Sequence, residues 1–175
     1  MNFYEFSNLT IKKTVKLISK KISNFTPMKI NKKLDNLLRK QGYIKVPLEV
    51  YNSGHIVLQL KLNGINSKFL LDTGASGTVL TKECIEQFNL KVEETEESGT
   101  GAGSTNLEMQ KTTNNVLSFQ SLRIEKLDFF IMDLKHVNDS FKEIGNELID
   151  AVLGADILIS RNCVIDYKGL NLYII

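Results

Sequence analysis

The sequence is poor in the residues that build disulfide frameworks and metal centres. Its 175 residues include two cysteines, Cys84 and Cys163, and two histidines, His55 and His136. Two cysteines are too few for a disulfide framework, and none of these four residues stands at the spacing of a zinc-binding motif. A zinc site needs three or four converging ligands, so we expect neither a metal nor any other cofactor.

Long apolar runs are also absent. No stretch of about 18 uninterrupted apolar residues occurs, and that is the length that a membrane-spanning helix requires. The first ten residues include Glu5 and several polar residues, and they lack the apolar core of a secretory signal. We therefore expect a cytoplasmic protein, and the share of apolar residues, 42%, is typical of a globular one.

Charge is distributed unevenly along the chain, although the net charge is only +2. Residues 1–45 hold eleven Lys and Arg against two Asp and Glu, a balance of +9, whereas residues 46–175 hold eleven against eighteen, a balance of −7. This asymmetry predicts a basic N-terminal extension, 1–45, and a main domain, 46–175.

Three roles are open for the extension. It packs on the main domain as an ordinary amphipathic segment, it contacts a membrane surface or another acidic partner, or it covers the acidic domain and restrains its activity. Nucleic acid is the weaker alternative, and we expect none as the main partner.

The extension has the apolar spacing of helices. Apolar residues recur at helical intervals over 11–22, until Pro27 interrupts the pattern. A second helix is predicted over 31–41, with Asn31 as its N-cap and Gly42 at its C-terminal end.

From residue 46 onward the apolar period becomes that of strands. Residues 55–62 alternate in polarity, and Asn63-Gly64 supplies the turn of a two-residue hairpin whose second strand ends in the apolar run 69–71. One short helix is predicted at 82–88, with Thr81 as its N-cap. Further strands are predicted at 79–80, 106–111, 116–119, 127–134, 164–167 and 170–174. Short strands and frequent turns predict a mainly β, barrel-like domain.

An ionisable residue directly follows the apolar run 69–71. Residues 72–77 read Asp-Thr-Gly-Ala-Ser-Gly. Burial there would raise the pKa of Asp72 unless a partner or hydrogen bonds hold its charge. Gly74 has no Cβ, so its backbone N–H can approach the carboxylate. Asp-Thr-Gly is also ordinary turn chemistry, so the surrounding segments must decide its meaning.

Three segments together resemble the signatures of retropepsin-like aspartic proteases. Residues 70–76, Leu-Leu-Asp-Thr-Gly-Ala-Ser, resemble the active-site loop of that family. Residues 151–158, Ala-Val-Leu-Gly-Ala-Asp-Ile-Leu, resemble the segment that passes behind the loop, and the glycine-rich residues 98–104 occupy the place of the flap. The resemblance covers about residues 50–175, and it implies an acid-protease barrel with one lobe per chain.

The resemblance also implies a role for individual residues. Asp72, Thr73 and Gly74 would form the catalytic loop, and Leu153 and Gly154 would support it from behind. The substrate would contact Ala75, Ser76, Gly99, Thr100, Gly101, Ala102 and Gly103. Asp156 is expected to support the helix or turn that begins there rather than to take part in catalysis.

The chemistry of the family requires two carboxylates that share a proton. This chain has a single Asp-Thr-Gly, so a twofold homodimer would have to bring Asp72 together with its copy. We expect an aspartic endopeptidase that acts on a peptide or protein substrate. The alternative is a non-catalytic peptide-binding or scaffold module on the same fold. The apolar residues 170–175 suit either a strand that joins two subunits or an ordinary core strand.

The glycines at 99, 101 and 103 also suggest a phosphate-binding loop. That hypothesis fails because neither the Gly-x-Gly-x-x-Gly spacing nor a Walker lysine is present. The four carboxylates at 93, 94, 96 and 97 would moreover repel a pyrophosphate.

Overall fold

The structure is a computed structural model that describes residues 32–101 and 104–175, with the backbone alone for residues 96–101 and 104–107. The helices of this part of the chain are α2 (Lys32–Lys40), α3 (Cys84–Gln87), α4 (Lys135–Glu143) and α5 (Ala155–Ser160). Its strands are β1 (Ile44–Pro47), β2 (Glu49–Val50), β3 (Ile56–Leu62), β4 (Ile65–Leu71), β5 (Val79–Thr81), β6 (Val92–Gly101), β7 (Ser104–Phe119), β8 (Leu122–Met132), β9 (Ala151–Leu153), β10 (Val164–Asp166) and β11 (Asn171–Ile174).

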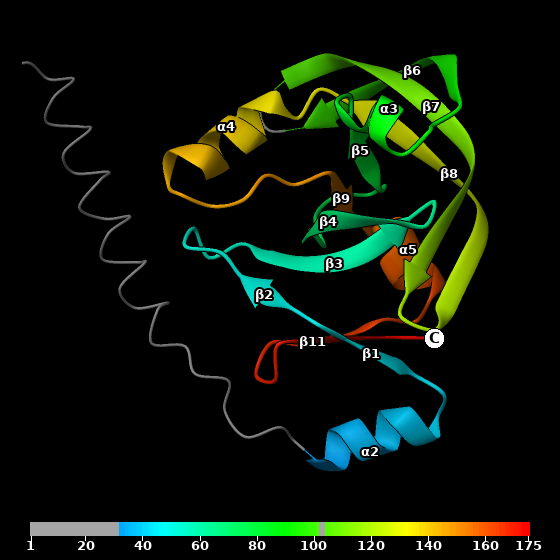
Figure 1. Ribbon diagram of the computed structural model, residues 1–175, viewed down its shortest axis with the longest axis vertical. Coiled ribbons are helices and arrows are strands. Elements are labelled where there is room, and N and C mark those ends of the chain that lie inside the picture. Colours follow the sequence, from blue (N-terminus) through cyan, green and yellow to red (C-terminus); the bar gives the residue numbers. More distant parts are fainter. Residues whose placement is uncertain (1–31, 102–103) are drawn as a thin grey trace, which may run out of the picture.

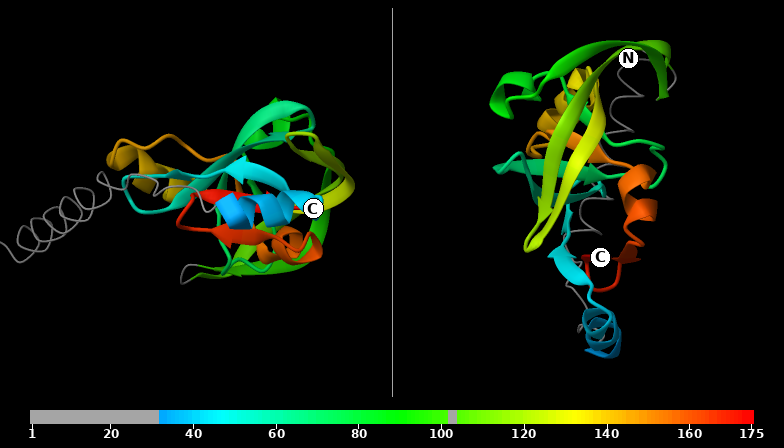
Figure 2. Two further views of the ribbon diagram at one scale, coloured as in Figure 1. Left: turned by 90° about the horizontal axis from the view of Figure 1, so that it is seen from below. Right: turned by 90° about the vertical axis from the view of Figure 1, so that its right-hand side faces the viewer.

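Most of these strands form one sheet that curls and closes on itself (Figure 1). Its order is β2-β3-β4-β9-β5-β8-β7-β6, and the end of β3 also pairs with β7, Leu62 lying opposite Leu117. This second pairing closes part of the sheet into a small barrel. A separate sheet of order β1-β11-β10 lies at the end of the molecule that carries α2 (Figures 1 and 2). The described chain is therefore mainly β and barrel-like, as predicted.

The barrel is filled by apolar side chains that its strands direct inward. In β3, Leu58, Leu60 and Leu62 are buried while Gln59 and Lys61 between them are exposed, as the alternation of the sequence predicts. They belong to one large cluster that also contains residues of β4, β7, β8, β9 and β11. Burial of this cluster is the main source of stability of the domain.

The hairpin between β3 and β4 confirms the predicted two-residue turn. Leu62 pairs with Ile65, so Asn63 and Gly64 alone form the loop. Both have positive φ angles, 51° and 86°, which is the backbone shape that a two-residue hairpin requires.

The strand prediction was wrong over 106–119, where two strands were expected and β7 is a single strand. Its pairing with β8 shifts register between Thr112 and Asn115, and Asn114 has a positive φ of 59°. Asn115 is buried at this irregularity, where its amide donates to Thr112 Oγ1 at 3.2 Å. A polar residue that is buried at a bulge breaks the apolar alternation, so the sequence pattern looked like the end of a strand.

The prediction of the short helix at 82–88 was correct in place but wrong in its cap. Thr81 is the last residue of β5, and its buried hydroxyl lies 3.1 Å from Cys84 Sγ. The helix α3 begins at Cys84 without a side-chain cap. The helix α4 was not predicted, and α5 begins at Ala155, where the sequence suggested a helix or a turn. No helix in the described ranges is long and apolar enough to cross a membrane.

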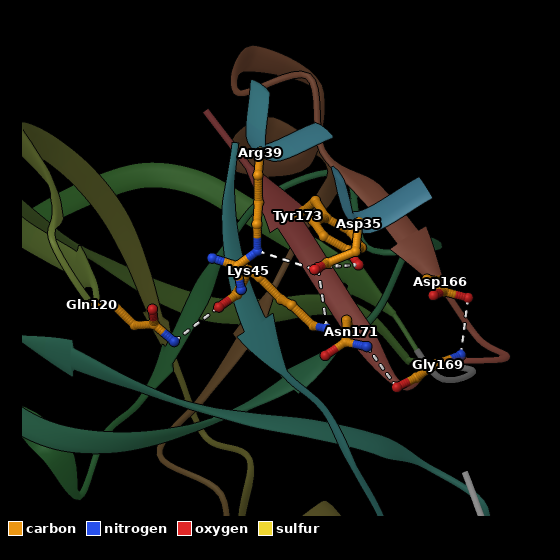
Figure 3. Close-up of polar contacts among 8 residues, drawn as sticks. All are labelled: Asp35, Arg39, Lys45, Gln120, Asp166, Gly169, Asn171 and Tyr173. Atoms are coloured by element: carbon orange, nitrogen blue, oxygen red, sulfur yellow. Dashed lines mark hydrogen bonds and ion pairs between the residues drawn. The ribbon is translucent and has the colours of Figure 1, made fainter. Parts of the chain in front are cut away.

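The helix α2 confirms the prediction over 31–41, and it is fastened to the small sheet (Figure 3). Asp35 accepts a hydrogen bond from the Tyr173 hydroxyl at 3.0 Å, and its carboxylate lies 3.2 Å from Lys45 Nζ. Burial, together with the nearby Asp35, raises the pKa of Tyr173 to about 12. The proposed N-cap Asn31 and the predicted helix at 11–22 lie outside the described residues, and the division after residue 45 stays a prediction.

Removing the buried phenyl ring of Phe69 in β4 should destabilise the barrel. Phe69 is 0% exposed, so Phe69→Ala is expected to lower the free energy of unfolding by about 3 to 5 kcal/mol, as measured by urea unfolding. Ile65→Ala on the same strand is the control, because Ile65 is 37% exposed and its loss should cost at most about 1 kcal/mol. Equal losses for the two variants would contradict this description of the core.

The contribution of Asp35 to the stability of the fold should depend on pH. Burial acts to raise the pKa of Asp35, but hydrogen bonds from Lys45, Tyr173 and Arg39 outweigh it, and the pKa lies below its ordinary value of 3.8. A depressed pKa gives stability that is complete above the unfolded-state value and is lost as the pH falls through the folded-state value. We expect Asp35→Asn to lower the thermal midpoint at neutral pH, and the difference from wild type to shrink toward strongly acidic pH.

Asp139→Asn is the matched control, since Asp139 is exposed and pairs with Lys135, one turn away on α4. A thermal midpoint of Asp35→Asn that stays below wild type by the same amount at every pH would show that the carboxylate charge is not involved.

Candidate active site

Two of the segments singled out in the sequence meet where β9 lies between β4 and β5. Next to β4 it is parallel, with Leu71 opposite Leu153, and next to β5 it is antiparallel, with Leu80 opposite Ala151. The loop 72–78 joins β4 to β5 and therefore has to pass over the end of β9. Asp72 is thus placed beside Leu153 and Gly154, as the resemblance implied.

Backbone groups hold Asp72 in place. Its own N–H donates to Leu153 O at 3.1 Å, which continues the pairing of β4 with β9. The Gly74 N–H donates to Asp72 Oδ1 at 2.8 Å, and the Ala75 N–H donates to the Asp72 carbonyl at 3.3 Å. A Cβ on Gly74 would lie 3.2 Å from Asp72 Oδ1, so glycine gives this carboxylate its close backbone donor. The loop therefore aims and stabilises a negatively charged oxygen.

The segment after β9 supports the loop from beneath. Ala155 N–H donates to Ala75 O at 2.8 Å, and Asp156 N–H donates to Ser76 O at 3.2 Å. Gly154 lies so close that an added Cβ would stand 2.5 Å from the carbonyl carbon and oxygen of Gly77. The support is a backbone-to-backbone contact that only glycine permits at this position.

A side-chain bridge completes this support. Thr78 is 1% exposed, and its hydroxyl donates to Asp156 Oδ1 at 2.7 Å while accepting the Gly154 N–H at 3.1 Å. Asp156 therefore braces the loop from the first turn of α5, whereas the sequence suggested support of the local helix or turn. Sequence reasoning missed Thr78, which lies 78 positions from Asp156. Its only signal was a small polar residue directly before the apolar β5.

The loop is open to solvent in a single chain. Thr73, Gly74 and Ser76 are exposed, and Asp72 is half-buried. The expected burial of Asp72 is therefore only partial in one chain, because the carboxylate stands at the end of the run 69–71. No hydrogen bond or ion pair joins Asp72 to a second carboxylate within the described residues.

Apolar side chains lie on one side of the loop. Ala75 and Val79 pack against a second cluster of buried residues, which is smaller than the main core. That cluster consists of Tyr51, Val57, Leu70, Leu134, Phe141, Ile149 and Val152. The loop that carries Asp72 therefore packs on an apolar cluster of its own chain through Ala75.

The predicted flap falls on a hairpin. Gly99, Thr100 and Gly101 lie in β6, where Gly99 pairs with Leu107 and Gly101 with Ser104 of β7. Ala102 and Gly103 lie outside the described residues. The hairpin is at the edge of the large sheet, since β6 is its last strand.

Within the described residues, neither a cysteine nor a metal site is a strong alternative to Asp72 as the catalytic group. Burial raises the pKa of both Cys84 and Cys163 to about 12, so neither thiol is a ready nucleophile near neutral pH. Among the residues that the structure describes, no group of three or more His, Cys, Asp or Glu is arranged to hold a metal ion.

Comparison with known proteins gives a family match. The model of the family described as "Aspartyl protease" matches residues 58–157, a range that contains both Asp72 and Gly154. No curated protein matches the sequence at a significant level.

Solved structures of similar shape come from bacterial, protozoan and viral sources. A retropepsin-like aspartic protease from Rickettsia conorii is 20% identical with a TM-score of 0.49, over 76% of this chain and 89% of that one. The retroviral protease-like domain of Ddi1 from Leishmania major is 17% identical with a TM-score of 0.49, over 72% and 90%. The inhibitor-bound EIAV protease is 21% identical with a TM-score of 0.44, over 59% and 85%.

The close contact under the loop can be tested by adding one methyl group. Gly154→Ala should lower the free energy of unfolding by about 1 to 3 kcal/mol, because the Cβ would force the backbone of the loop to move. Gly77→Ala is the matched control, since a Cβ there meets nothing within 4 Å, and its effect should stay within about 0.5 kcal/mol. Chemical unfolding measures both, and equal stabilities of the two variants would refute the contact.

Proposed function

This chain belongs to the aspartyl protease family, and from that membership we propose that it is an endopeptidase whose active site is completed by a second copy of the chain. Water, activated by Asp72 and the Asp72 of that copy, would attack the carbonyl carbon of a peptide bond. The observation that carries the proposal is the placement of Asp72. Its carboxylate is half-buried, is oriented by the Gly74 N–H and is supported by Gly154 and the Thr78–Asp156 bridge.

The two carboxylates would divide the work between them. Two carboxyl groups about 3 Å apart cannot both be ionised easily, so they share one proton. The ionised group takes a proton from the attacking water, and the protonated group donates a hydrogen bond to the carbonyl oxygen. The Gly74 N–H would stabilise the ionised form through Oδ1 and fix the direction of the carboxylate. No metal and no covalent intermediate takes part in these steps.

The content of the chain supports a homodimer. It holds one Asp-Thr-Gly, and the exposed residues around Asp72 leave space for a symmetry mate. A twofold axis next to Asp72 brings identical loops together and needs no second motif. Thr73, which is exposed at the tip of the loop, would face the loop of the partner.

The substrate would be an extended segment of peptide or protein. Gly74, Ala75 and Ser76 would offer backbone groups to it in the manner of an added strand. The β6–β7 hairpin with residues 99–103 would close over it as a flap.

The decisive experiment compares wild type with Asp72→Asn on a mixture of denatured proteins. New termini, identified by mass spectrometry at several values between about pH 4 and about pH 7, should appear with wild type. Asp72→Asn should lose at least about 100-fold in cleavage rate, because its amide cannot accept the proton of water. Asp139→Asn is the matched control, since Asp139 is an exposed carboxylate on α4.

Cleavage that persists in purified Asp72→Asn would refute the proposal. A folded wild-type dimer that binds extended peptides at the same surface and cleaves none would favour the alternative, a non-catalytic peptide-binding module.

A further inference from the structure

The helix α2 is fixed to one end of the molecule by a buried strand. β11 lies between β1 and β10 in the small sheet, and Leu172, Tyr173 and Ile174 are at most 1% exposed. Of the two roles left open for 170–175, the structure therefore shows the core strand. Because Asp35 of α2 accepts the hydrogen bond of the Tyr173 hydroxyl, the helix is held in place by a strand of the core (Figure 3).

The opposite face of α2 is turned to solvent. Lys33, Leu37 and Lys40 are all exposed, and their spacing of four and three residues places them on one side of the helix. Leu37 is 54% exposed, whereas the neighbouring Leu38 is buried. Figures 1 and 2 show α2 at the extremity of the described chain, beyond β1 and β11. The helix thus presents an apolar side chain between two lysines to its surroundings.

The sequence before α2 repeats this combination. Residues 1–31 lie outside the described part of the chain, and they hold six lysines against a single acidic residue, Glu5. Over 11–22, the apolar residues at helical spacing share one side of the predicted helix: Ile11, Val15, Ile18 and Ile22. The lysines of this range border that side or lie opposite it: Lys12, Lys13, Lys16, Lys20 and Lys21. The extension and α2 therefore share one pattern, an apolar stripe with lysines around it.

An anionic membrane surface accepts both parts of this pattern. The apolar side chains of such a helix enter the boundary between headgroups and acyl chains, while its lysines face the charged headgroups. Nucleic acid would bind the lysines but leave the apolar stripe in water. The acidic main domain could attract residues 1–31, but it cannot cover the free face of α2, because Asp35 fixes the helix with Leu38 inward.

We propose that residues 1–31 and the face of α2 formed by Lys33, Leu37 and Lys40 bind the surface of an anionic phospholipid membrane. Leu37 and the apolar residues of 11–22 enter the headgroup region, and the lysines of both segments face the lipid charges. This inference goes beyond the proposed function and does not depend on it, since it involves no residue of the Asp72 loop.

The attachment extends from α2 to the whole described domain. The strand that follows the helix, β1, pairs with β11, and the Gln120 side chain in the turn between β7 and β8 donates to the carbonyl oxygen of Lys45 at 2.8 Å (Figure 3). The helix, the small sheet and the barrel are thereby connected. A membrane that binds α2 therefore holds the candidate active site close to the lipid surface.

Sedimentation with lipid vesicles tests the proposal on the full-length chain. Wild type should bind phosphatidylcholine vesicles that contain about 30% phosphatidylserine at least about tenfold more tightly than vesicles of phosphatidylcholine alone. The difference should shrink as the salt concentration rises from about 0.1 M to about 0.5 M, because salt screens the attraction between lysines and lipid.

Replacing Leu37 by aspartate separates the face of α2 from the rest of the chain. Leu37→Asp should weaken binding to phosphatidylserine vesicles at least about fivefold, because it removes an apolar contact and adds a charge that the lipid repels. Leu148→Asp is the matched control, since it adds the same charge at a leucine with 53% exposure on the connection between α4 and β9. This control should bind like wild type.

The sequence contains no tryptophan, which allows a direct probe of the contact. In Leu37→Trp the new indole is the only one in the chain, so its emission should move to shorter wavelength on phosphatidylserine vesicles as the ring leaves water. The emission of Leu148→Trp should not change under the same conditions.

Three results would each overturn the proposal: equal or absent binding to the two kinds of vesicle, Leu37→Asp binding as tight as that of wild type, or unchanged Leu37→Trp emission when the chain is bound. Binding of wild type to duplex DNA but not to vesicles would identify nucleic acid as the partner and would overturn it as well. Asp72→Asn should bind vesicles like wild type, so failure of the proposed activity and failure of this surface are separate results.

Discussion

The close approach of Gly154 to the backbone of Gly77 and Thr78 is the contact on which the site depends. It allows β9 to end directly under the loop of Asp72, so that Ala155 and Asp156 reach the loop carbonyls with their N–H groups. The strand order β4-β9-β5 serves the same end, because it places the start and the end of the loop on either side of one support. A carboxylate on a surface loop is thereby held by backbone contacts on one side, although its other side remains open.

Features set by neighbours in sequence were the ones that could be predicted. The alternation in β3, the positive φ angles of Asn63 and Gly64, and the place of Asp72 at the end of an apolar run depend on short stretches of chain. The order of the loop, the glycine-rich segment and the Gly154 segment supplied the resemblance to aspartic proteases, and the family match agrees with it. Such local signals identify a site even where the sequence gives no sign of the distant residues that support it.

Features set by distant residues could not be predicted. The bridge between Thr78 and Asp156 joins residues that share no periodic pattern, and the buried Asn115 hides the continuity of β7 by interrupting its apolar alternation. The central position of β11 is of the same kind, because an apolar strand looks the same in sequence whether its neighbours come from its own chain or from another. Whether a terminal strand joins two subunits is decided by the number of its free edges.

The bond between Asp35 and Tyr173 spans 138 positions, and this separation has a consequence for the order of folding. Of the described elements α2 is the first and β11, which carries Tyr173, is the last, so α2 can dock through this bond only after β11 has joined the small sheet. Contacts of such high sequence separation close late and slowly. The docking of α2 is therefore expected to follow the pairing of strands that are neighbours in sequence, such as those of the β3–β4 hairpin.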